Sequence, residues 1–399
     1  MLNKDGVREL AYVVKIDAIE PIVGSDNCEA AVVGGWRVMT RKGTFQPGDL
    51  AVYFEIDSQV PATEQFAFLE KKHYKVKTQK YTFGGKGNFV SQGLLMAFGD
   101  FAVDTSAWEL GTFLTQELGV KYADPDDNKR KAASVDKYKK MAQRRPDLFK
   151  KDWARWLMRR GWGKKLLFFF FGKAKDKKNG WPAWVVKTDE ERVQNMAWIL
   201  EEKTPWFATE KIDGTSTTFT MKGYGRKREF YICSRNVVFD KPDKDCFYET
   251  NVYTEMGEKY DMEHVLECLM EYFAITTGKE IAFVTLQGET YGAGIQKRDY
   301  GMTDHDFMAF NLIVGYGDGK TQRLNPREMT DVLTIFDVPC VPIVDENFIL
   351  PDTVDELLNI ATDASKVDGG MREGLVFRSA DGTRSFKAVS NEFLLKYHA

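Results

Sequence analysis

The stretch Thr209-Glu210-Lys211-Ile212-Asp213-Gly214-Thr215-Ser216 places one lysine between two acidic residues, with a glycine three positions after the lysine. A lysine amine is protonated at neutral pH because its unperturbed pKa is about 10.4, and only the neutral amine is a nucleophile. Burial, a neighbouring cation or a metal-bound target can activate such an amine. The stretch therefore predicts a nucleophile at Lys211. Gly214, which lacks a Cβ, would let the backbone approach a ligand closely.

Four further polar clusters follow at predicted strand ends and decide whether Lys211 is a nucleophile or part of a surface salt-bridge run. They are Ser234-Arg235-Asn236, Gly288–Gln296 with Glu289, Phe307–Asn311 with Phe310, and the hairpin from Glu373–Arg378 to Ser385–Val389 with Lys387. Two carboxylates, one arginine, two lysines and an aromatic ring are what a nucleoside-triphosphate pocket needs. The alternatives are simple ion pairs for the charged groups and core packing for the ring.

Composition limits the class of protein. The chain has 399 residues, enough for two or three domains, and its 43% apolar and 29% charged residues are typical of a globular protein. The five scattered cysteines and four histidines argue against a zinc site and for a reducing compartment. The longest apolar burst, Leu166 to Phe171, is too short to cross a bilayer, and no apolar signal region is present. We expect a cytoplasmic protein without a membrane partner.

Positive charge is concentrated in one segment. Residues 121–178 contain 20 lysines and arginines and seven aspartates but no glutamate, although the whole chain has a net charge of −3. Aromatic residues, among them Trp153, Trp156 and Trp162, are interleaved with this charge. Such a segment favours a polyphosphate partner such as nucleic acid. The alternative is a solvated helical insertion whose aromatic side chains dock on the rest of the molecule.

Three segments are predicted along the chain, and together they indicate an α+β protein. Residues 1–103 contain the strand-like runs 9–23, 28–42, 50–56 and 92–98, which suit a small Greek-key barrel of the OB type that holds nucleic acid. Residues 104–180 predict a basic helical insertion or linker, with Lys129–Arg160 as its best helix. Residues 181–399 predict a mixed domain with strands 207–211, 217–222, 230–234, 281–289, 307–314, 374–379 and 384–389, and helices 250–276, 326–336 and 353–364.

The ordered clusters resemble the motifs of the covalent nucleotidyltransferases, the superfamily of polynucleotide ligases and mRNA capping enzymes. They look most like ATP-dependent RNA ligases of the RNA ligase 2 type. In those proteins Gly-Glu, Gly-Ile-Gln and Tyr-Gly precede an aromatic strand residue, and here these are Gly288-Glu289, Gly294-Ile295-Gln296, Tyr300-Gly301 and Phe310. The resemblance covers about residues 181–390. It implies an ATP-grasp-like nucleotidyltransferase domain of antiparallel sheets with flanking helices. The approach from Trp181 to Asn195 is similar to RNA ligases that carry an OB domain ahead of the catalytic domain.

The resemblance also implies a role for each site residue. Lys211 would attack the α-phosphate of ATP, and AMP would then pass to an RNA 5′-phosphate before a 3′-hydroxyl displaces it. Glu210 would lie beside the adenine and Phe310 would stack on it. Arg235 and Glu289 would engage the ribose, and Lys387 the α-phosphate. Asp213, Glu289 and Glu373 would hold Mg²⁺ or Mn²⁺ through its water shell, and Gly214, Ser216 and Lys187 complete the predicted nucleotide-binding set.

Three positions depart from the family pattern. Ser216 stands where some members have asparagine, and Asn311 stands where an aspartate often follows the aromatic residue. Val389 replaces the second lysine of the last motif and leaves Lys387 alone, with Lys187 or Lys396 as candidates for the missing charge. No Arg-x-Asp-Lys of the kind found near the C-terminus of capping enzymes and DNA ligases is present.

We therefore expect an ATP-dependent RNA ligase that seals 3′-hydroxyl and 5′-phosphate ends at nicks in duplex RNA or in an RNA/DNA hybrid. No obligate protein partner is inferred. The alternatives are a DNA ligase or an mRNA guanylyltransferase on the same scaffold, and a catalytically inactive nucleic-acid-binding homologue. The single lysine of the last motif is the feature that favours the inactive homologue.

Overall fold

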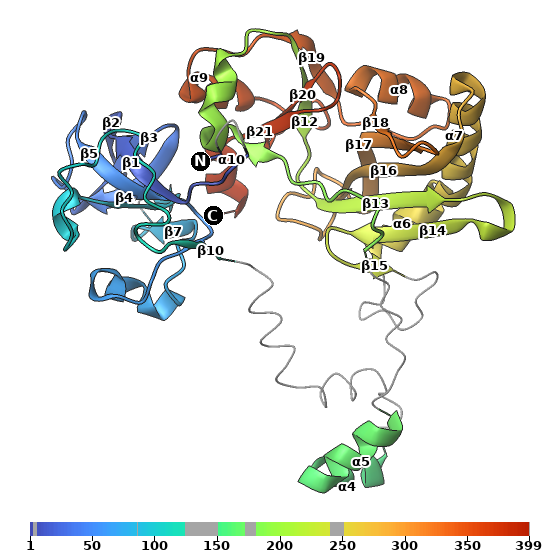
Figure 1. Cartoon of the computed structure of the whole chain (residues 1–399), viewed down its shortest axis with the longest axis horizontal. Coiled ribbons are helices and arrows are strands. Elements are labelled where there is room, and N and C mark those ends of the chain that lie inside the picture. The colour runs from blue at the N-terminus through green and yellow to red at the C-terminus, as the bar shows by residue number, and fades with distance from the viewer. Residues whose placement is uncertain (3–5, 86, 124–150, 172–180, 240–250, 399) are drawn as a thin grey trace.

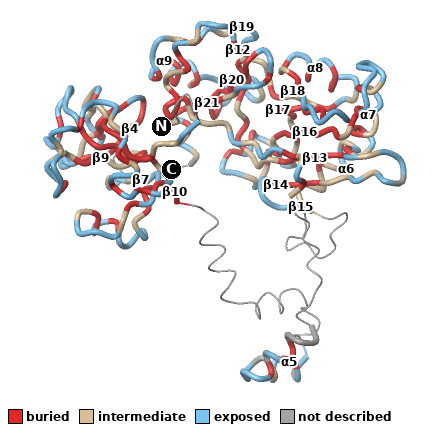
Figure 2. The backbone as a smooth tube through the Cα atoms, in the orientation of Figure 1, coloured by how far each residue is buried: buried red, intermediate tan, exposed pale blue. Residues whose placement is uncertain are grey.

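The computed structural model describes residues 1–2, 6–85, 87–123, 151–171, 181–239 and 251–398. A body of small sheets near the N-terminus lies beside a larger body that has two sheets with flanking helices (Figure 1). Buried residues follow the strands of both bodies, so each has a core of its own (Figure 2). The expected α+β class is confirmed. Within the described ranges, no helix has the length and apolar character needed to cross a membrane.

Short antiparallel strands build the N-terminal body. The strands are β1 (Ala11–Lys15), β5 (Leu50–Phe54) and β9 (Leu94–Met96) in one sheet, β2 (Ala18–Pro21), β3 (Cys28–Val33) and β4 (Trp36–Arg41) in a second, and the pairs β7 (Gln79–Thr82) with β8 (Asn88–Ser91) and β6 (Ser58–Gln59) with β10 (Lys121–Tyr122). The predicted runs 9–23 and 28–42 are each two strands. Gly34 and Gly35, both with positive φ, form the tight turn that divides the second run.

The core of this body extends beyond the predicted boundary at residue 103. Phe54 and Phe66 pack in the same apolar cluster as Trp108, Leu114 and Val120. Two short 3-10 helices, η1 (Glu64–Lys72) and η2 (Phe98–Asp100), lie between the strands. The 20 residues after 103 therefore belong structurally to the N-terminal body rather than to the basic insertion.

Two short helices, α4 (Asp152–Met158) and α5 (Gly161–Phe171), form the described part of the basic insertion. Most of the predicted helix Lys129–Arg160 lies outside the described residues. The apolar run Leu166–Phe171 also allowed the prediction of a buried strand, and that prediction is wrong because these residues form the end of α5. A short apolar run has no periodicity that separates a strand from a helix, which explains the error.

A six-stranded antiparallel sheet is the larger sheet of the C-terminal body. Its order is β15 (Val238–Phe239), β14 (Glu229–Ser234), β13 (Thr215–Lys222), β16 (Ile281–Gly292), β17 (His305–Tyr316) and β18 (Thr321–Arg323). Helices α6 (Val252–Lys259), α7 (Met262–Thr277) and α8 (Pro326–Thr334) share a core with this sheet. The predicted helix 250–276 is two helices, because Asp261 adopts a left-handed conformation between them.

A five-stranded sheet is the second sheet of the C-terminal body. Its order is β11 (Glu191–Arg192), β21 (Ser385–Val389), β20 (Gly374–Ser379), β12 (Trp206–Lys211) and β19 (Ile343–Phe348). Its core includes residues of η3 (Val193–Glu201) and α9 (Val354–Ala361), and the chain ends in α10 (Asn391–Phe393) and the π-helix η5 (Leu394–His398). Thr353 caps α9, since its hydroxyl accepts the Glu356 N–H at 3.2 Å.

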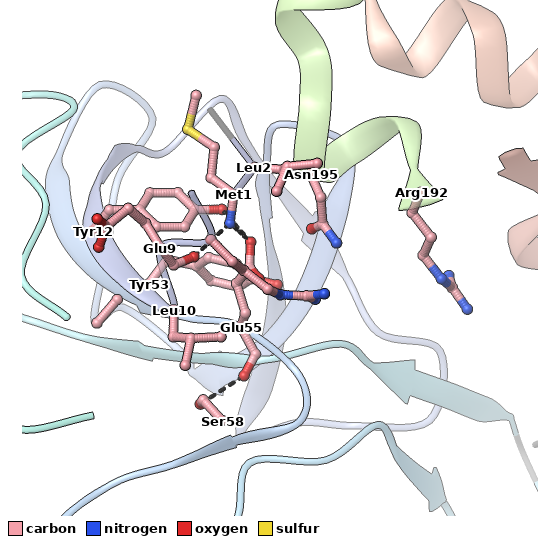
Figure 3. A network of polar contacts seen from close by, with 12 residues as sticks. Met1, Leu2, Glu9, Leu10, Tyr12, Tyr53, Glu55, Ser58, Arg192 and Asn195 are labelled. Carbon is pink, nitrogen blue, oxygen red and sulfur yellow. Dashed lines mark hydrogen bonds and ion pairs between the residues drawn. The ribbon is translucent and has the colours of Figure 1, made fainter. Parts of the chain in front are cut away.

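Polar contacts join the two bodies around β11 and η3. Arg8 of the N-terminal body lies 3.1 Å from Glu191 and 3.4 Å from Glu55. The backbone N–H of Leu2 donates to the Asn195 carbonyl at 2.5 Å. Figure 3 shows the Met1 amine against Glu55, with Asn195 close to Leu2. The segment that enters the C-terminal body is therefore fixed to the N-terminal body.

Candidate active site

A cavity of about 350 Å³ lies between the two sheets of the C-terminal body. It brings together nine of the eleven predicted site residues, namely Glu210, Lys211, Asp213, Gly214, Ser216, Arg235, Glu289, Phe310 and Lys387. Glu373 lies directly behind the cavity wall, in contact with Lys211. Lys187 is not among the lining residues; its amine donates to the Asn236 side chain at 3.0 Å and lies 5.1 Å from the Trp181 ring centre.

Strand pairing places Lys211 beside Glu373. In the antiparallel register of β12 with β20, Lys211 is opposite Gly374, the residue after Glu373. The Lys211 amine donates to a Glu373 carboxylate oxygen at 2.6 Å. About a quarter of the lysine side chain is exposed, at 24%. The amine is therefore held at the end of its strand and is reachable from the cavity.

Three carboxylates determine the charge state of Lys211. Burial disfavours the ammonium form, but the charges of Glu373, Glu289 and Asp213 outweigh it and raise the pKa of the Lys211 amine. Burial also raises the pKa of Glu289 to about 8; Lys211 opposes this shift, while Glu373 and Asp213 add to it. Without a further cation, the site therefore holds a protonated amine and a carboxyl that resists ionisation.

These carboxylates suit a hydrated divalent cation. Its charge would favour the ionised form of Glu289 and offset the groups that keep Lys211 protonated. In the described part of the chain, no group of three His, Cys, Asp or Glu side chains is arranged to hold a metal ion directly. Carboxylate oxygens are the ligands that magnesium prefers, and magnesium commonly keeps several waters, so the three carboxylates fit a hydrated ion.

The Glu210 carboxylate is buried and already bonded. It accepts the Ser365 hydroxyl at 2.5 Å and the Lys366 backbone N–H at 2.7 Å. The backbone N–H of Glu210 donates to the Pro342 carbonyl at 2.9 Å. Glu210 thus fastens the segment before β20 to the strand that carries Lys211, in addition to lining the cavity.

A tyrosine and a glutamine hold the loop after Lys211. The Asp213 N–H donates to the Tyr300 hydroxyl at 2.7 Å, and the Gln296 side-chain amide donates to the Gly214 carbonyl at 2.9 Å. A Cβ on Gly214 would lie 2.3 Å from the Thr290 carbonyl oxygen. The glycine is therefore required by close approach to β16, whereas the sequence suggested approach to a nucleotide.

Arg378 is a cavity residue that the sequence analysis did not assign. It is 2% exposed and donates to Asn311 at 3.2 Å and Thr209 at 3.1 Å, and it lies 3.4 Å from Glu190. Its guanidinium is 5.8 Å from the Phe310 ring centre. The sequence signal was an arginine inside the otherwise apolar strand Gly374–Ser379, because a buried charge needs partners.

Phe310 and Ser216 enter the cavity from the six-stranded sheet. Phe310 is half-buried and packs on an apolar cluster that contains Tyr300 and Val341, so core packing and a ring exposed to the cavity are both present. The Ser216 hydroxyl is 3.4 Å from the Thr188 hydroxyl. Asn311, on the same strand as Phe310, bonds to Arg378 and Gln287. The asparagine at this position is therefore an acceptor for a buried arginine.

Arg235 and Lys387 lie on opposite sides of the cavity mouth and share one acidic neighbour. Arg235 follows β14, and its guanidinium is 2.6 Å from the Asp189 carboxylate. The Lys387 amine on β21 is 3.5 Å from the same carboxylate. Burial lowers the pKa of Lys387, and Asp189 opposes that shift. Two cations that line the cavity are thus paired with one exposed carboxylate.

Two family models match this chain. Residues 204–398 match the RNA ligase family, and residues 10–97 match an OB-fold domain. The first match contains the cavity residues from Thr209 to Lys387, and the second contains β1 to β9 of the N-terminal body. No curated protein sequence matches the chain.

Solved structures of the Naegleria gruberi RNA ligase are similar to nearly the whole chain. The form with PPi is 26% identical, with 98% of this chain and 99% of that chain covered and a TM-score of 0.61. A mutant with ATP and Mn is 25% identical, with 98% and 100% covered and a TM-score of 0.62. Another mutant, with AMP and Mn, is 26% identical, with 98% and 99% covered and a TM-score of 0.62. Residues 204–398 therefore form a domain of the RNA ligase family, and an OB-fold domain at residues 10–97 precedes it.

Proposed function

We propose that this protein is an ATP-dependent RNA ligase that joins a 3′-hydroxyl to a 5′-phosphate at nicks in duplex RNA or RNA/DNA hybrids. The reaction proceeds through a lysyl–AMP intermediate on Lys211. The observation that carries the proposal is the position of the Lys211 amine, at the wall of a cavity between two sheets and surrounded by Glu373, Glu289 and Asp213. The structures of the Naegleria ligase with ATP and Mn support ATP and a divalent metal as cofactors.

In the first step the Lys211 nitrogen attacks the α-phosphorus of ATP. An N–P bond forms, the bond to the β-phosphate oxygen breaks, and pyrophosphate leaves. Lys387 would offset the charge of the α-phosphate, and Phe310 would stack on the adenine. Arg235, which the resemblance placed at the ribose, shares Asp189 with Lys387, and we assign it to phosphate as well. A divalent metal would polarise the α-phosphate and lower the pKa of the attacking amine.

The protein's own contacts prepare this step. Glu373 keeps the amine at the end of β12, and it can take the ammonium proton because it already accepts the Nζ–H. Tyr300 and Gln296 keep Asp213 and Gly214 in place after the lysine. In the later steps AMP passes to the RNA 5′-phosphate, and the 3′-hydroxyl displaces it to form the phosphodiester bond. Lys211 is then free again.

Labelling tests the covalent intermediate. Incubation with α-labelled ATP and Mg²⁺ or Mn²⁺ should give a labelled band at the mass of the intact chain, whereas γ-labelled ATP should give none. Lys211→Ala should abolish the band. Lys222→Ala is the matched control because Lys222 is an exposed lysine at the end of β13, the next strand along the chain, and it should label normally. A band that persists in Lys211→Ala would contradict the proposal.

Substrate choice needs a second assay. Labelled GTP in place of ATP distinguishes a guanylyltransferase, which would accept GTP. Nicked duplexes with ribose or deoxyribose exchanged on each side of the break then distinguish RNA sealing from DNA sealing. We expect joining to require a ribose at the 3′-hydroxyl end. Equal joining of all-DNA nicks would favour a DNA ligase, and adduct formation without joining would limit the protein to the first step.

A further inference from the structure

Asp189 lines the cavity and lies in the approach segment Trp181–Asn195, but the proposed reaction gives it no role. It lies between the predicted site residue Lys187 and strand β11, and its carboxylate lines the cavity. The carboxylate is 2.6 Å from Arg235, which follows the six-stranded sheet, and 3.5 Å from Lys387 in the five-stranded sheet. One acidic side chain therefore bridges the two cations across the mouth.

A carboxylate and a nucleotide phosphate would bind the same donor groups of these two cations. Both groups present negatively charged oxygen acceptors, and an arginine guanidinium binds either of them. Arg235 and Lys387 cannot keep short contacts with Asp189 and give the same donors to a phosphate. In the described structure, Asp189 therefore holds the place that a ligand's anionic oxygens would take.

The contacts on both sides of Asp189 show how it can leave this place. The Thr188 hydroxyl is 3.4 Å from the Ser216 hydroxyl, and Glu190 is 3.4 Å from the buried Arg378. The backbone is thus anchored before and after Asp189, while 62% of the Asp189 side chain is exposed. Rotation of the side chain into water would release both cations without moving either sheet.

We propose that Asp189 is an internal counter-ion that competes with nucleotide phosphates for Arg235 and Lys387, and so sets the affinity for ATP. The proposal rests on the proposed function, because it takes the cavity to be the ATP site. Asp189 keeps the Arg235 and Lys387 side chains in place when the cavity is empty. It weakens the binding of every phosphate ligand, and it recovers its contacts once the nucleotide has left the cavity.

Equilibrium binding of ATP with Mg²⁺ tests the proposal. Lys211→Ala is used as the background in all variants, so that no covalent transfer disturbs the measurement. Asp189→Asn keeps the shape of the side chain and removes its charge. An exposed ion pair contributes at most about 1 kcal/mol, so we expect the Kd for ATP to fall by about two- to fivefold. Adenosine, which has no phosphate, should bind with unchanged Kd.

Asp352→Asn is the matched control, because Asp352 is 89% exposed and pairs with Lys203 at 2.9 Å outside the cavity. It should leave the Kd for ATP unchanged. An unchanged or higher Kd in Asp189→Asn, with unchanged thermal unfolding, would overturn the proposal and make Asp189 a positioning group for the cations. Tighter binding of adenosine as well as ATP would also overturn it. The proposed function fails on a different observation, namely a wild-type protein that forms no lysyl–AMP.

Discussion

The two sheets that enclose the cavity hold their polar side chains in different ways. On the five-stranded sheet, three charged groups of the site have protein partners: Lys211 bonds to Glu373, Glu210 to Ser365 and Lys366, and Arg378 to Asn311 and Thr209. On the six-stranded sheet, Glu289 is a half-buried acid with its pKa raised to about 8.

This difference separates the groups that build the site from those that respond to a ligand. Removing a buried side chain that is hydrogen-bonded or ion-paired leaves its partners unsatisfied and lowers the free energy of unfolding. A buried carboxyl that resists ionisation costs stability itself, and a bound cation removes that cost. We therefore expect substitutions on the five-stranded sheet to weaken the fold. Substitution of Glu289 should weaken ligand chemistry while leaving the fold intact.

The largest expected effect is that of Glu289→Gln on self-adenylylation. The substitution removes one carboxylate from the candidate metal set, and loss of such electrostatic stabilisation commonly lowers a rate by about 10²–10³-fold. The free energy of unfolding should stay equal or rise, because the amide needs no charge. Single-turnover labelling with ATP and Mn²⁺, together with urea unfolding, measures both quantities.

Glu280→Gln is the control for this prediction, since Glu280 is an exposed residue directly before β16, at the end opposite to Glu289. It should change neither the rate nor the stability. A clear loss of stability in Glu289→Gln would break the proposed contrast between the sheets, because Glu289 would then be a structural group like Arg378.

The second prediction concerns the five-stranded sheet. Arg378→Met should lower the free energy of unfolding by about 3 kcal/mol, since Glu190, Asn311 and Thr209 would all lose a buried charged partner. Urea unfolding without nucleotide or metal measures the change. Arg384→Met is the control, because Arg384 is 45% exposed in its pair with Glu202, and it should cost less than about 1 kcal/mol. Equal losses in the two variants would contradict the prediction.

Part of this architecture was visible in the sequence. Lys211, Glu289 and Glu373 could be identified because each is in or next to a predicted strand and belongs to an ordered motif. Strand β20 was predicted with its observed bounds, Gly374–Ser379. Local residue patterns contain this information, because strand ends carry polar residues and strand interiors carry apolar ones.

The contacts that hold the site together could not be predicted in this way. Arg378 meets Asn311 across 67 residues, Tyr300 meets Asp213 across 87, and Lys387 meets Asp189 across 198. None of these pairs joins neighbouring strands of one sheet, so each depends on how the two sheets and the loops between them pack together. The local residue pattern does not contain that packing, so an arginine in an apolar strand could be noticed but its partners could not be named.

The third prediction uses the raised pKa of Glu289. In the metal-free fold this carboxyl keeps its proton up to pH about 8, whereas its usual pKa is 4.5. Between these values the folded state binds a proton that the unfolded state has lost, so stability falls as the pH rises. We expect the wild type to lose about 2 kcal/mol more than Glu289→Gln between pH 6 and pH 8.

Urea unfolding in a chelator at several pH values measures this difference. Added Mg²⁺ should reduce the loss in the wild type and leave Glu289→Gln unchanged, because only the wild type has a carboxylate for the cation to favour. A wild type that gains stability relative to the variant over this range would show that Glu289 is ionised in the metal-free fold. The six-stranded sheet would then not contain a carboxyl whose charge state changes when a cation binds.

The smallest expected effect tests the loop that joins the two sheets. Asp213 lies between β12 and β13, and its N–H donates to Tyr300 from the connection between β16 and β17. Tyr300→Phe leaves this buried N–H without its acceptor and should cost about 1 kcal/mol of stability, with adenylylation slowed by a few-fold. Tyr231→Phe, which removes an exposed bond to Glu229, is the control and should change neither quantity. If Tyr300→Phe slows adenylylation without any loss of stability, the hydroxyl acts on the position of Asp213 alone. If the substitution lowers stability as much as Arg378→Met does, the loop stabilises the fold in the same way as the bonded groups of the five-stranded sheet. The contrast between the two sheets would then have to include this loop.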